Sequence, residues 1–148
     1  MIRPKLIAVA AAVLASTAAA VVPATSALAY ISPPLVLLAE AQGPASLVAG
    51  GAAVDVPVEY SCSAESMYIG VQLAQAVKKQ VAVGSGSTQV PCDGRTHRVL
   101  VRVRADAAGV AFAKGKASAT TDVYGCTSKG GGYLCGDDTI ERTIKLKK

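Results

Sequence analysis

The feature that most constrains the fold is a two-residue alternation in the run from His97 to Ala105. The odd positions carry Val99, Val101 and Val103, and the even positions carry Arg98, Arg102 and Arg104. Leu100 is the exception in the arginine row. Successive side chains of a β-strand point to opposite faces, so this period places the valines on one face and the arginines on the other. The run therefore predicts a half-buried strand.

Apolar alternation recurs elsewhere, most clearly over residues 54–62. One face of that run carries Val54, Val56, Val58, Tyr60 and Cys62. Pro57, on the other face, has no N–H to donate, so we expect this strand at a sheet edge or at a bulge. About seven or eight such short runs, with turn signals roughly every ten residues, predict an all-β sandwich or small barrel.

Three short stretches give turn signals. We expect a turn at Lys78-Lys79, between two strands, in preference to a helix over residues 72–80, because β-branched residues flank the pair. The Gly-Ser-Gly-Ser stretch at 84–87 and the Asp-Gly pair at 93–94 predict two further turns.

The chain begins with the pattern of a secretory signal peptide. Arg3 and Lys5 precede a nearly continuous apolar run over residues 6–22, and Ala27-Leu28-Ala29 supplies the small residues that a signal peptidase reads. Cleavage after Ala29 would leave a mature chain that begins at Tyr30. The alternative is an uncleaved membrane anchor.

The remainder is long enough for one domain with its own core. We expect a helical signal peptide over residues 1–29, an extended N-terminal segment over 30–44 and one β domain over 45–148. Without Arg3 and Lys5, the chain keeps 13 of its 15 basic residues and has 10 acidic ones, which gives a net charge of +3. This balance is too mild to indicate nucleic acid. Few aromatic residues and no tryptophan argue against a stacking platform for bases or sugars.

Four cysteines remain after the signal peptide: Cys62, Cys92, Cys126 and Cys135. An even number in an exported chain favours disulfides. No pair has the short C-x-x-C spacing of zinc sites, so a four-thiolate metal site is not expected. Of the three possible connectivities we expect the adjacent one, Cys62–Cys92 with Cys126–Cys135.

Residues that could carry chemistry are few. His97 is the only histidine, which excludes a two-histidine metal site, and no G-x-S-x-G motif occurs. The acidic cluster of Asp137, Asp138 and Glu141 lacks the spacing of an EF-hand loop, so we expect it to solvate a turn. We therefore expect no catalytic residue, metal or cofactor, and an enzyme is the least favoured class.

One candidate binding surface is the arginine face, defined as Arg98, Arg102 and Arg104. Arginines at this period could meet the repeating phosphates or carboxylates of an anionic polymer as forked donors. Lys116 and Lys145 could extend the face if their strands lie beside this one. The alternative is an ordinary charged outer face of a sheet.

A second candidate is the glycine-rich loop between Cys126 and Cys135. A disulfide would hold its ends while Lys129 and Tyr133 project at the tip, and loops on a rigid scaffold often carry recognition. The alternative is a structural hairpin whose disulfide adds only stability, about 2–4 kcal/mol.

Four features together resemble small secreted immunoglobulin-like sandwich proteins of high-GC actinobacteria. They are the signal peptide, the cysteine-bearing strands, the segment Phe112-Ala-Lys-Gly-Lys-Ala and the cysteine-bounded final hairpin loop. The resemblance implies an immunoglobulin-like antiparallel sandwich of about seven strands, secreted and either extracellular or associated with the cell wall. The chain departs from antibody domains because the buried tryptophan is missing and the Cys62 to Cys92 spacing is short.

These observations favour a secreted, non-catalytic binding module that acts at or outside the cell surface. Its expected partner is an anionic cell-envelope polymer or another extracellular protein, and membrane contact is expected only through an uncleaved signal segment. One alternative is a carrier of a small apolar ligand, which predicts an apolar cleft between sheets. Another is a protease inhibitor that presents Lys129, although the following glycines weigh against a preorganised loop.

Overall fold

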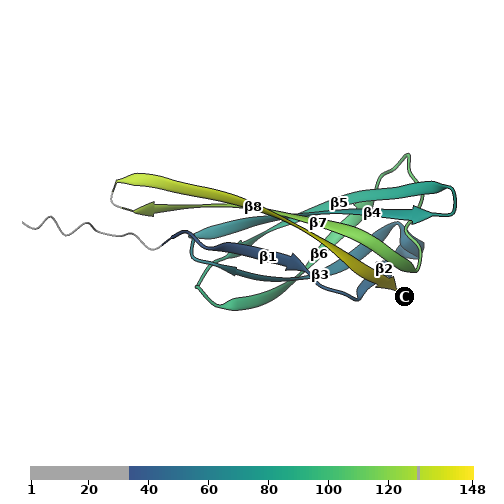
Figure 1. The fold of residues 1–148 in the computed structure, drawn as a ribbon, viewed down its shortest axis with the longest axis horizontal. Helices are drawn as coiled ribbons and strands as arrows, with labels where there is room; N and C mark the ends of the chain where they lie inside the picture. Colours follow the sequence, from purple (N-terminus) through teal and green to yellow (C-terminus); the bar gives the residue numbers. More distant parts are fainter. Residues whose placement is uncertain (1–33, 130) are drawn as a thin grey trace, which may run out of the picture. The chain divides into compact units, whose positions relative to one another are not determined.

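The computed structural model describes residues 34–129 and 131–148, and the predicted signal peptide (1–29) lies outside them. In this part the chain is all-β, as predicted, with one short 3-10 turn, η1 (Ala49–Gly51). The strands, drawn in Figure 1, are β1 (Leu37–Ala41), β2 (Ala45–Val48), β3 (Ala53–Cys62), β4 (Ser66–Val77), β5 (Gln80–Pro91), β6 (Thr96–Ala105), β7 (Gly115–Lys129) and β8 (Gly132–Lys147).

Most of the strands join into a closed, barrel-like sheet. Hydrogen-bonded neighbours follow the order β3-β2-β8-β7-β4-β5-β6, and β6 pairs back onto β3. β1, which falls within the segment 30–44, pairs with β3 on the same edge as β2. Two links of the ring are short: β2–β8, a parallel ladder of two residue pairs, and β5–β6, an antiparallel ladder of two pairs.

The interior is filled by the apolar faces that the alternation predicts. The fully buried side chains include Val54, Val56 and Val58 of β3, Met67, Ile69 and Val71 of β4, and Val101 and Val103 of β6. Each leaves at most 1% of its surface exposed. Burying a side chain of this size is worth about 1.5–3 kcal/mol. The predicted half-buried strands over 54–62 and 97–105 are therefore confirmed as β3 and β6.

Pro57 lies inside the sheet, so the edge or bulge predicted for its strand is wrong. On one side β3 pairs continuously with β6, and Pro57 stands opposite Leu100. On the other side β1 pairs from Val58 onward and β2 only as far as Asp55, which leaves Pro57 at the junction between them. Its carbonyl accepts a hydrogen bond there from the Gln42 N–H at 2.7 Å. The missing N–H of Pro57 faces this junction, where no ladder partner is needed.

The turn at Lys78-Lys79 is confirmed, because Val77 pairs with Gln80 across it. The turn predicted at residues 84–87 is wrong, because this stretch lies inside β5. Gly84 and Gly86 are present for a different reason: β6 crosses β5 so closely that a Cβ at either position would collide with a carbonyl oxygen of β6. Glycine here permits a close approach of two backbones.

Both disulfides join cysteines that are adjacent in the order of the chain. Cys62–Cys92 ties the end of β3 to the segment after β5, with the Cα atoms 5.1 Å apart. Cys126–Cys135 joins directly opposite residues of β7 and β8, with the Cα atoms 4.0 Å apart. The β7–β8 ladder continues beyond it to the Lys129–Gly132 pair. The cysteine-bounded segment is therefore a two-stranded hairpin rather than an open loop.

Candidate binding surfaces

The arginine face lies on the outer surface of β6, beside acidic residues of β3. The register sets Arg102 opposite Asp55 and Arg98 opposite Glu59. Arg102 donates two hydrogen bonds to the Asp55 carboxylate, from Nε at 2.7 Å and from a terminal nitrogen at 2.9 Å. A terminal nitrogen of Arg98 lies 3.3 Å from the Glu59 carboxylate. Arg104 forms no ion pair within the described residues.

These pairs match two of the three cations of the arginine face, Arg98 and Arg102. The hydrogen bonds from Arg102 lower the pKa of Asp55 below its usual 3.8, and Asp55 in turn raises the pKa of Arg102. The Arg102 side chain remains 58% exposed, so water screens the pair and its effect on stability is small. Opposite charges on directly facing positions of two strands neutralise each other.

Lys116 and Lys145 do not extend the arginine face. β6 has β3 and β5 as its neighbours, whereas these lysines belong to β7 and β8. The possibility that their strands lie beside β6 is therefore corrected, because the order of strands in the sheet separates them.

The cysteine-bounded hairpin is anchored near its tip. Ser128 donates two hydrogen bonds to Glu65, from its hydroxyl at 2.7 Å and from its N–H at 3.4 Å. These bonds lower the pKa of Glu65. Tyr133 is 85% exposed beyond the disulfide. The side chain of Lys129 lies outside the described part of the chain, so its place at the tip stays a prediction.

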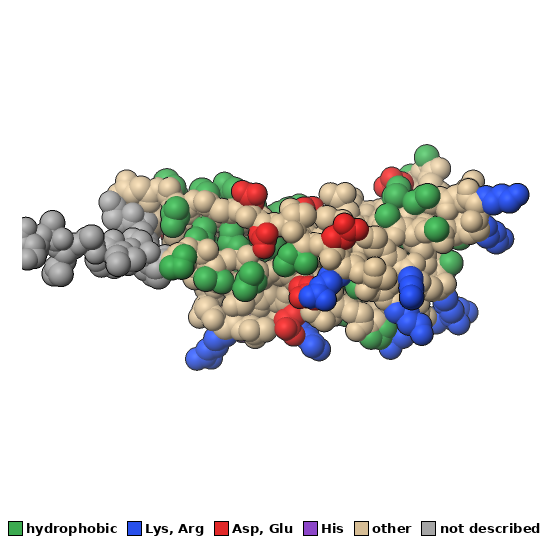
Figure 2. Space-filling view, viewed as in Figure 1, with side chains coloured by type: hydrophobic (Ala, Val, Ile, Leu, Met, Phe, Trp, Pro, Cys, Tyr) green, Lys and Arg blue, Asp and Glu red, His purple; other side chains and the backbone are tan. Residues whose placement is uncertain are grey.

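Basic side chains gather at the other end of the barrel, where β4 turns into β5, β7 begins and β8 ends (Figure 2). The lysine cluster is defined as Lys78, Lys79, Lys114, Lys116, Lys145, Lys147 and Lys148. The turns at this end carry one acidic side chain, Asp106. Within the described residues no lysine of the cluster forms an ion pair. This end is therefore the most unbalanced concentration of charge on the described surface.

Specific contacts bring the segments of the lysine cluster together. Ala74 of β4 stands opposite Ser118 of β7, so the β4–β5 turn ends beside the start of β7. Gln75, only 4% exposed, donates to the Ala113 carbonyl at 2.8 Å and accepts from the Ala113 N–H at 2.9 Å. This double hydrogen bond fixes the backbone just before Lys114.

Two lysines of the cluster stand directly opposite each other. Lys116 and Lys145 are ladder partners on β7 and β8. The same ladder, without interruption, places Cys126 opposite Cys135 at a Cα separation of 4.0 Å, a closely spaced pair. Close and wide pairs alternate along an antiparallel ladder, so the lysine pair, ten residues away, is also a close one. Like charges at such a position repel each other, and a bound anion would relieve that repulsion.

Lys78 occupies a backbone conformation that favours glycine. Its φ is 54°, in the left-handed region, and Lys79 beside it has no positive φ. A residue with a Cβ loses about 1–2 kcal/mol in this region. The chain therefore places a positive charge at the tip of this turn at some expense of stability.

Sequence reasoning missed the lysine cluster because its members come from separate segments. Lys78-Lys79 is a turn, Lys114 and Lys116 flank Gly115, and the others end the chain. The available signal was their position at turns and strand ends, which an antiparallel sheet can bring to one end.

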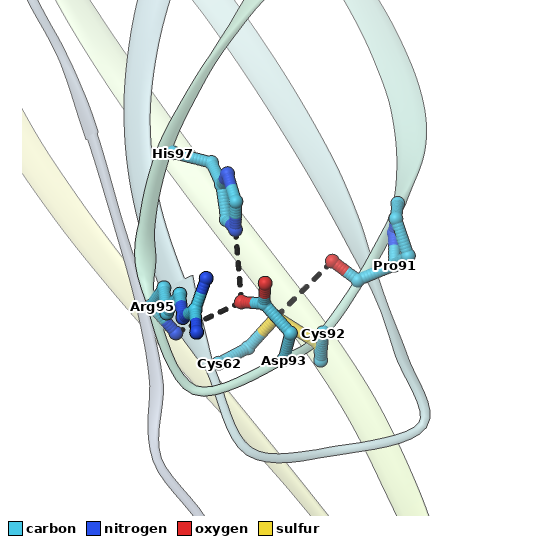
Figure 3. A network of polar contacts seen from close by, with 6 residues as sticks. All are labelled: Cys62, Pro91, Cys92, Asp93, Arg95 and His97. Atoms are coloured by element: carbon cyan, nitrogen blue, oxygen red, sulfur yellow. Dashed lines mark hydrogen bonds and ion pairs between the residues drawn. A yellow bond between two sulfur atoms is a disulfide. The ribbon is translucent and has the colours of Figure 1, made fainter.

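His97 takes part in a small polar network at the start of β6 (Figure 3). Its Nε2 lies 2.8 Å from Asp93 Oδ1, which also accepts a hydrogen bond from the Arg95 N–H at 2.9 Å. These bonds, with the one from Arg95 contributing most, lower the pKa of Asp93. The figure also joins Cys62 Sγ to the Pro91 carbonyl at 4.0 Å. That contact is not a hydrogen bond, because a disulfide sulfur carries no hydrogen.

The network stabilises the Asp93-Gly94 turn, which confirms the turn predicted there. Gly94 has a φ of 78°, a conformation that glycine adopts without strain.

Within the described residues no group of three or more histidine, cysteine, aspartate or glutamate side chains could hold a metal ion. No helix in the same part of the chain is long and apolar enough to span a membrane.

The chain has a distant structural likeness to a known protein. No family model matches the chain, and no curated protein sequence matches it. Among solved structures it is similar to AggA, the major subunit of aggregative adherence fimbriae type I from Escherichia coli, with a TM-score of 0.45 and 8% identity. The match covers 79% of this chain and 98% of the AggA chain. A likeness this weak indicates nothing about function.

Proposed function

We propose that this protein is a secreted, non-catalytic module that binds an anionic polymer of the cell envelope through the lysine cluster. The observation that carries the proposal is the charge at one end of the barrel, where the lysine cluster lies and the turns of the described chain carry a single acidic side chain, Asp106. The arginine face contributes less, because Asp55 and Glu59 already hold two of its cations.

A polymer with repeated phosphates or carboxylates suits this surface. Its charges recur along a flexible chain, so several can contact separated lysines at once, and each contact releases counterions. An anion between Lys116 and Lys145 would also remove their repulsion. Exposed charges are screened by salt, with a Debye length of about 10 Å at 0.1 M, so binding should weaken steeply as the salt concentration rises.

Location and architecture belong to the same proposal. Two disulfides suit an oxidising compartment outside the cytoplasm, and the signal peptide expected over residues 1–29 would take the chain there. The links β2–β8 and β5–β6 are short, so the ring divides into two larger sheets, β8-β7-β4-β5 and β1/β2-β3-β6. This division supports an immunoglobulin-like sandwich of the kind found in small secreted actinobacterial proteins.

The alternative functions have less support. A carrier of a small apolar ligand needs a cleft between the sheets, where this chain places fully buried side chains such as Val56, Met67 and Val101. A protease inhibitor needs a free, extended reactive segment, whereas the backbone of Lys129 is a ladder partner of Gly132.

Retention on isolated cell walls tests the proposed function. Mature protein is incubated at low and at high salt with walls of the producing organism, before and after chemical removal of their anionic polymers. We expect retention on untreated walls at low salt, and weaker retention at high salt or on stripped walls. Equal retention on stripped walls would overturn the proposal, because the bound component would then not be the anionic polymer.

A further inference from the structure

A groove lies along β5, and its lining includes no lysine of the lysine cluster. It has a volume of about 730 Å³, and a smaller hollow of about 370 Å³ continues it and shares two of its residues, Gln72 and Ser85. Its lining combines small residues of β5 with longer side chains of the neighbouring strands. The small residues are Ser85, Gly86 and Ser87, and the longer side chains include Tyr68, Gln72, Arg102 and Arg104. A groove of this size accommodates a ligand of several rings.

Gly70 of β4 is the residue that points to a ligand. It lines the groove in the middle of a long strand, where glycine weakens a sheet. Packing does not require it: a Cβ there would come no closer than 3.7 Å to the Asp122 carbonyl oxygen and to Tyr68 Cε1. Its φ is not in the left-handed region either. A glycine that the fold does not need, facing a groove, is typical of a site that another molecule approaches closely.

The chemistry of the lining suits a hydroxyl-rich chain. The hydroxyls of Ser85 and Ser87 can each donate and accept, the Asp122 carboxylate accepts, and Arg104 donates. Sugar hydroxyls need both kinds of partner. A polyanion would meet the Asp122 carboxylate, and an apolar ligand would leave these polar groups unpaired. Tyr68, half exposed, adds a flat apolar ring beside them.

Several of these side chains are already held in place. Asp122 accepts a hydrogen bond from the Thr139 hydroxyl at 2.9 Å and a longer one from Gln72 Nε2 at 3.4 Å. Arg102 is fixed by its two hydrogen bonds to Asp55. Groups that are ordered before binding lose little entropy when a ligand arrives.

We propose that this groove binds a neutral glycan strand, laid across Gly70 and along β5. The site goes beyond the proposed function, because it uses neither the lysine cluster nor its charge. With both surfaces in use, the protein would hold the anionic polymer at one end and a glycan along its side.

Titration with neutral hexasaccharides tests the inference. The ligands are chitohexaose, cellohexaose and maltohexaose, followed by NMR on labelled mature protein. We expect saturable binding of at least one, with shifts at Gly70, Gln72 and Ser85. Gly70→Val should weaken that binding at least about tenfold, because the new side chain fills the groove. Its thermal unfolding midpoint should equal or exceed that of the unmodified protein, since valine favours strands.

A matched control is Ala76→Val, on the same face of the same strand, where Ala76 is exposed opposite Val81. It should bind the sugar as the unmodified protein does. The inference is overturned if none of the three sugars binds, if Gly70→Val binds normally, or if both variants lose binding equally. Gly70→Val should keep its binding to inorganic polyphosphate, and Lys116→Gln/Lys145→Gln should keep sugar binding, so the two proposals fail separately.

Discussion

The arginine face and the lysine cluster are both rich in cations, but they differ in what stands beside those cations. On β6, Arg98 and Arg102 face Glu59 and Asp55 across a continuous ladder. At the end of the barrel, Lys116 faces Lys145. The carboxylates of β3 neutralise Arg98 and Arg102, whereas Lys116 and Lys145 leave their charges available to an external anion.

The difference indicates that a row of cations in a strand offers unmatched charge only where the neighbouring strand supplies no carboxylates. The arginines are the more regular pattern in the sequence, yet the irregularly spaced lysines carry more of the unmatched charge. The two regions should therefore respond differently to the same change of charge.

Removing two charges from each region should have unequal effects. We expect Lys116→Gln/Lys145→Gln to weaken binding to inorganic polyphosphate about tenfold at low salt, because each lost contact also loses its counterion release. Arg98→Gln/Arg102→Gln changes the net charge by the same amount and should weaken binding less than about threefold. Titration calorimetry at two salt concentrations measures both. Equal losses would mean that only net charge matters and that the contrast is false.

Freeing the arginines should create binding where little exists. In Asp55→Asn/Glu59→Gln the partners of Arg102 and Arg98 lose their charges, so we expect affinity for polyphosphate to rise about two- to fivefold. The same titration measures this gain. No gain would show that the carboxylates are not what keeps the arginine face from binding.

Acid should release Arg102 from its ion pair with Asp55. The folded pKa of Asp55 lies below 3.8, so its pair with Arg102 stabilises the fold at pH values above the unfolded pKa. That contribution disappears as the pH falls through the lower, folded pKa. We expect the difference in urea midpoint between the unmodified protein and Arg102→Gln to be small and constant above the unfolded pKa of Asp55, and to shrink as the pH falls through the lower, folded pKa. A difference that persists in acid would contradict the assignment.

The smallest expected effect concerns the turn of the lysine cluster. Lys78→Gly removes a charge but relieves a φ of 54°, so we expect the free energy of unfolding to rise by about 0.5 kcal/mol. Lys79→Gly removes the same charge at an ordinary φ and should lower that free energy by a similar amount. Urea unfolding of both variants distinguishes backbone strain from charge. A loss of stability in Lys78→Gly would show that the left-handed conformation is not strained.

Much of the fold follows from local pattern, because the alternation of apolar and polar residues in a half-buried strand shows which side chains face the core. β3 and β6 are predictable in this way. Register is not, since Asp55 and Arg102 are 47 residues apart and nothing between them specifies their pairing. The glycines at 84 and 86 mislead for a similar reason: a turn and a close crossing of strands both require glycine, and only the distant β6 backbone distinguishes them.

The candidate sites are harder to predict than the strands. The lysine cluster is assembled from three separate segments by the β4–β7 and β7–β8 ladders. Gly70 is one glycine among many in the sequence. It becomes a candidate site residue only because Ser87 and Asp122 pair with it from the two neighbouring strands. Such sites need the order of the strands as well as their pattern.

NMR titration of labelled mature protein with inorganic polyphosphate shows which of the two regions binds the anion. We predict saturable shifts at the amides of residues 78–79, 114–116 and 145–148, with residues 98–104 unaffected. Shifts centred on residues 98–104, with the lysine cluster unchanged, would show that the arginine face binds the anion and the lysine cluster does not.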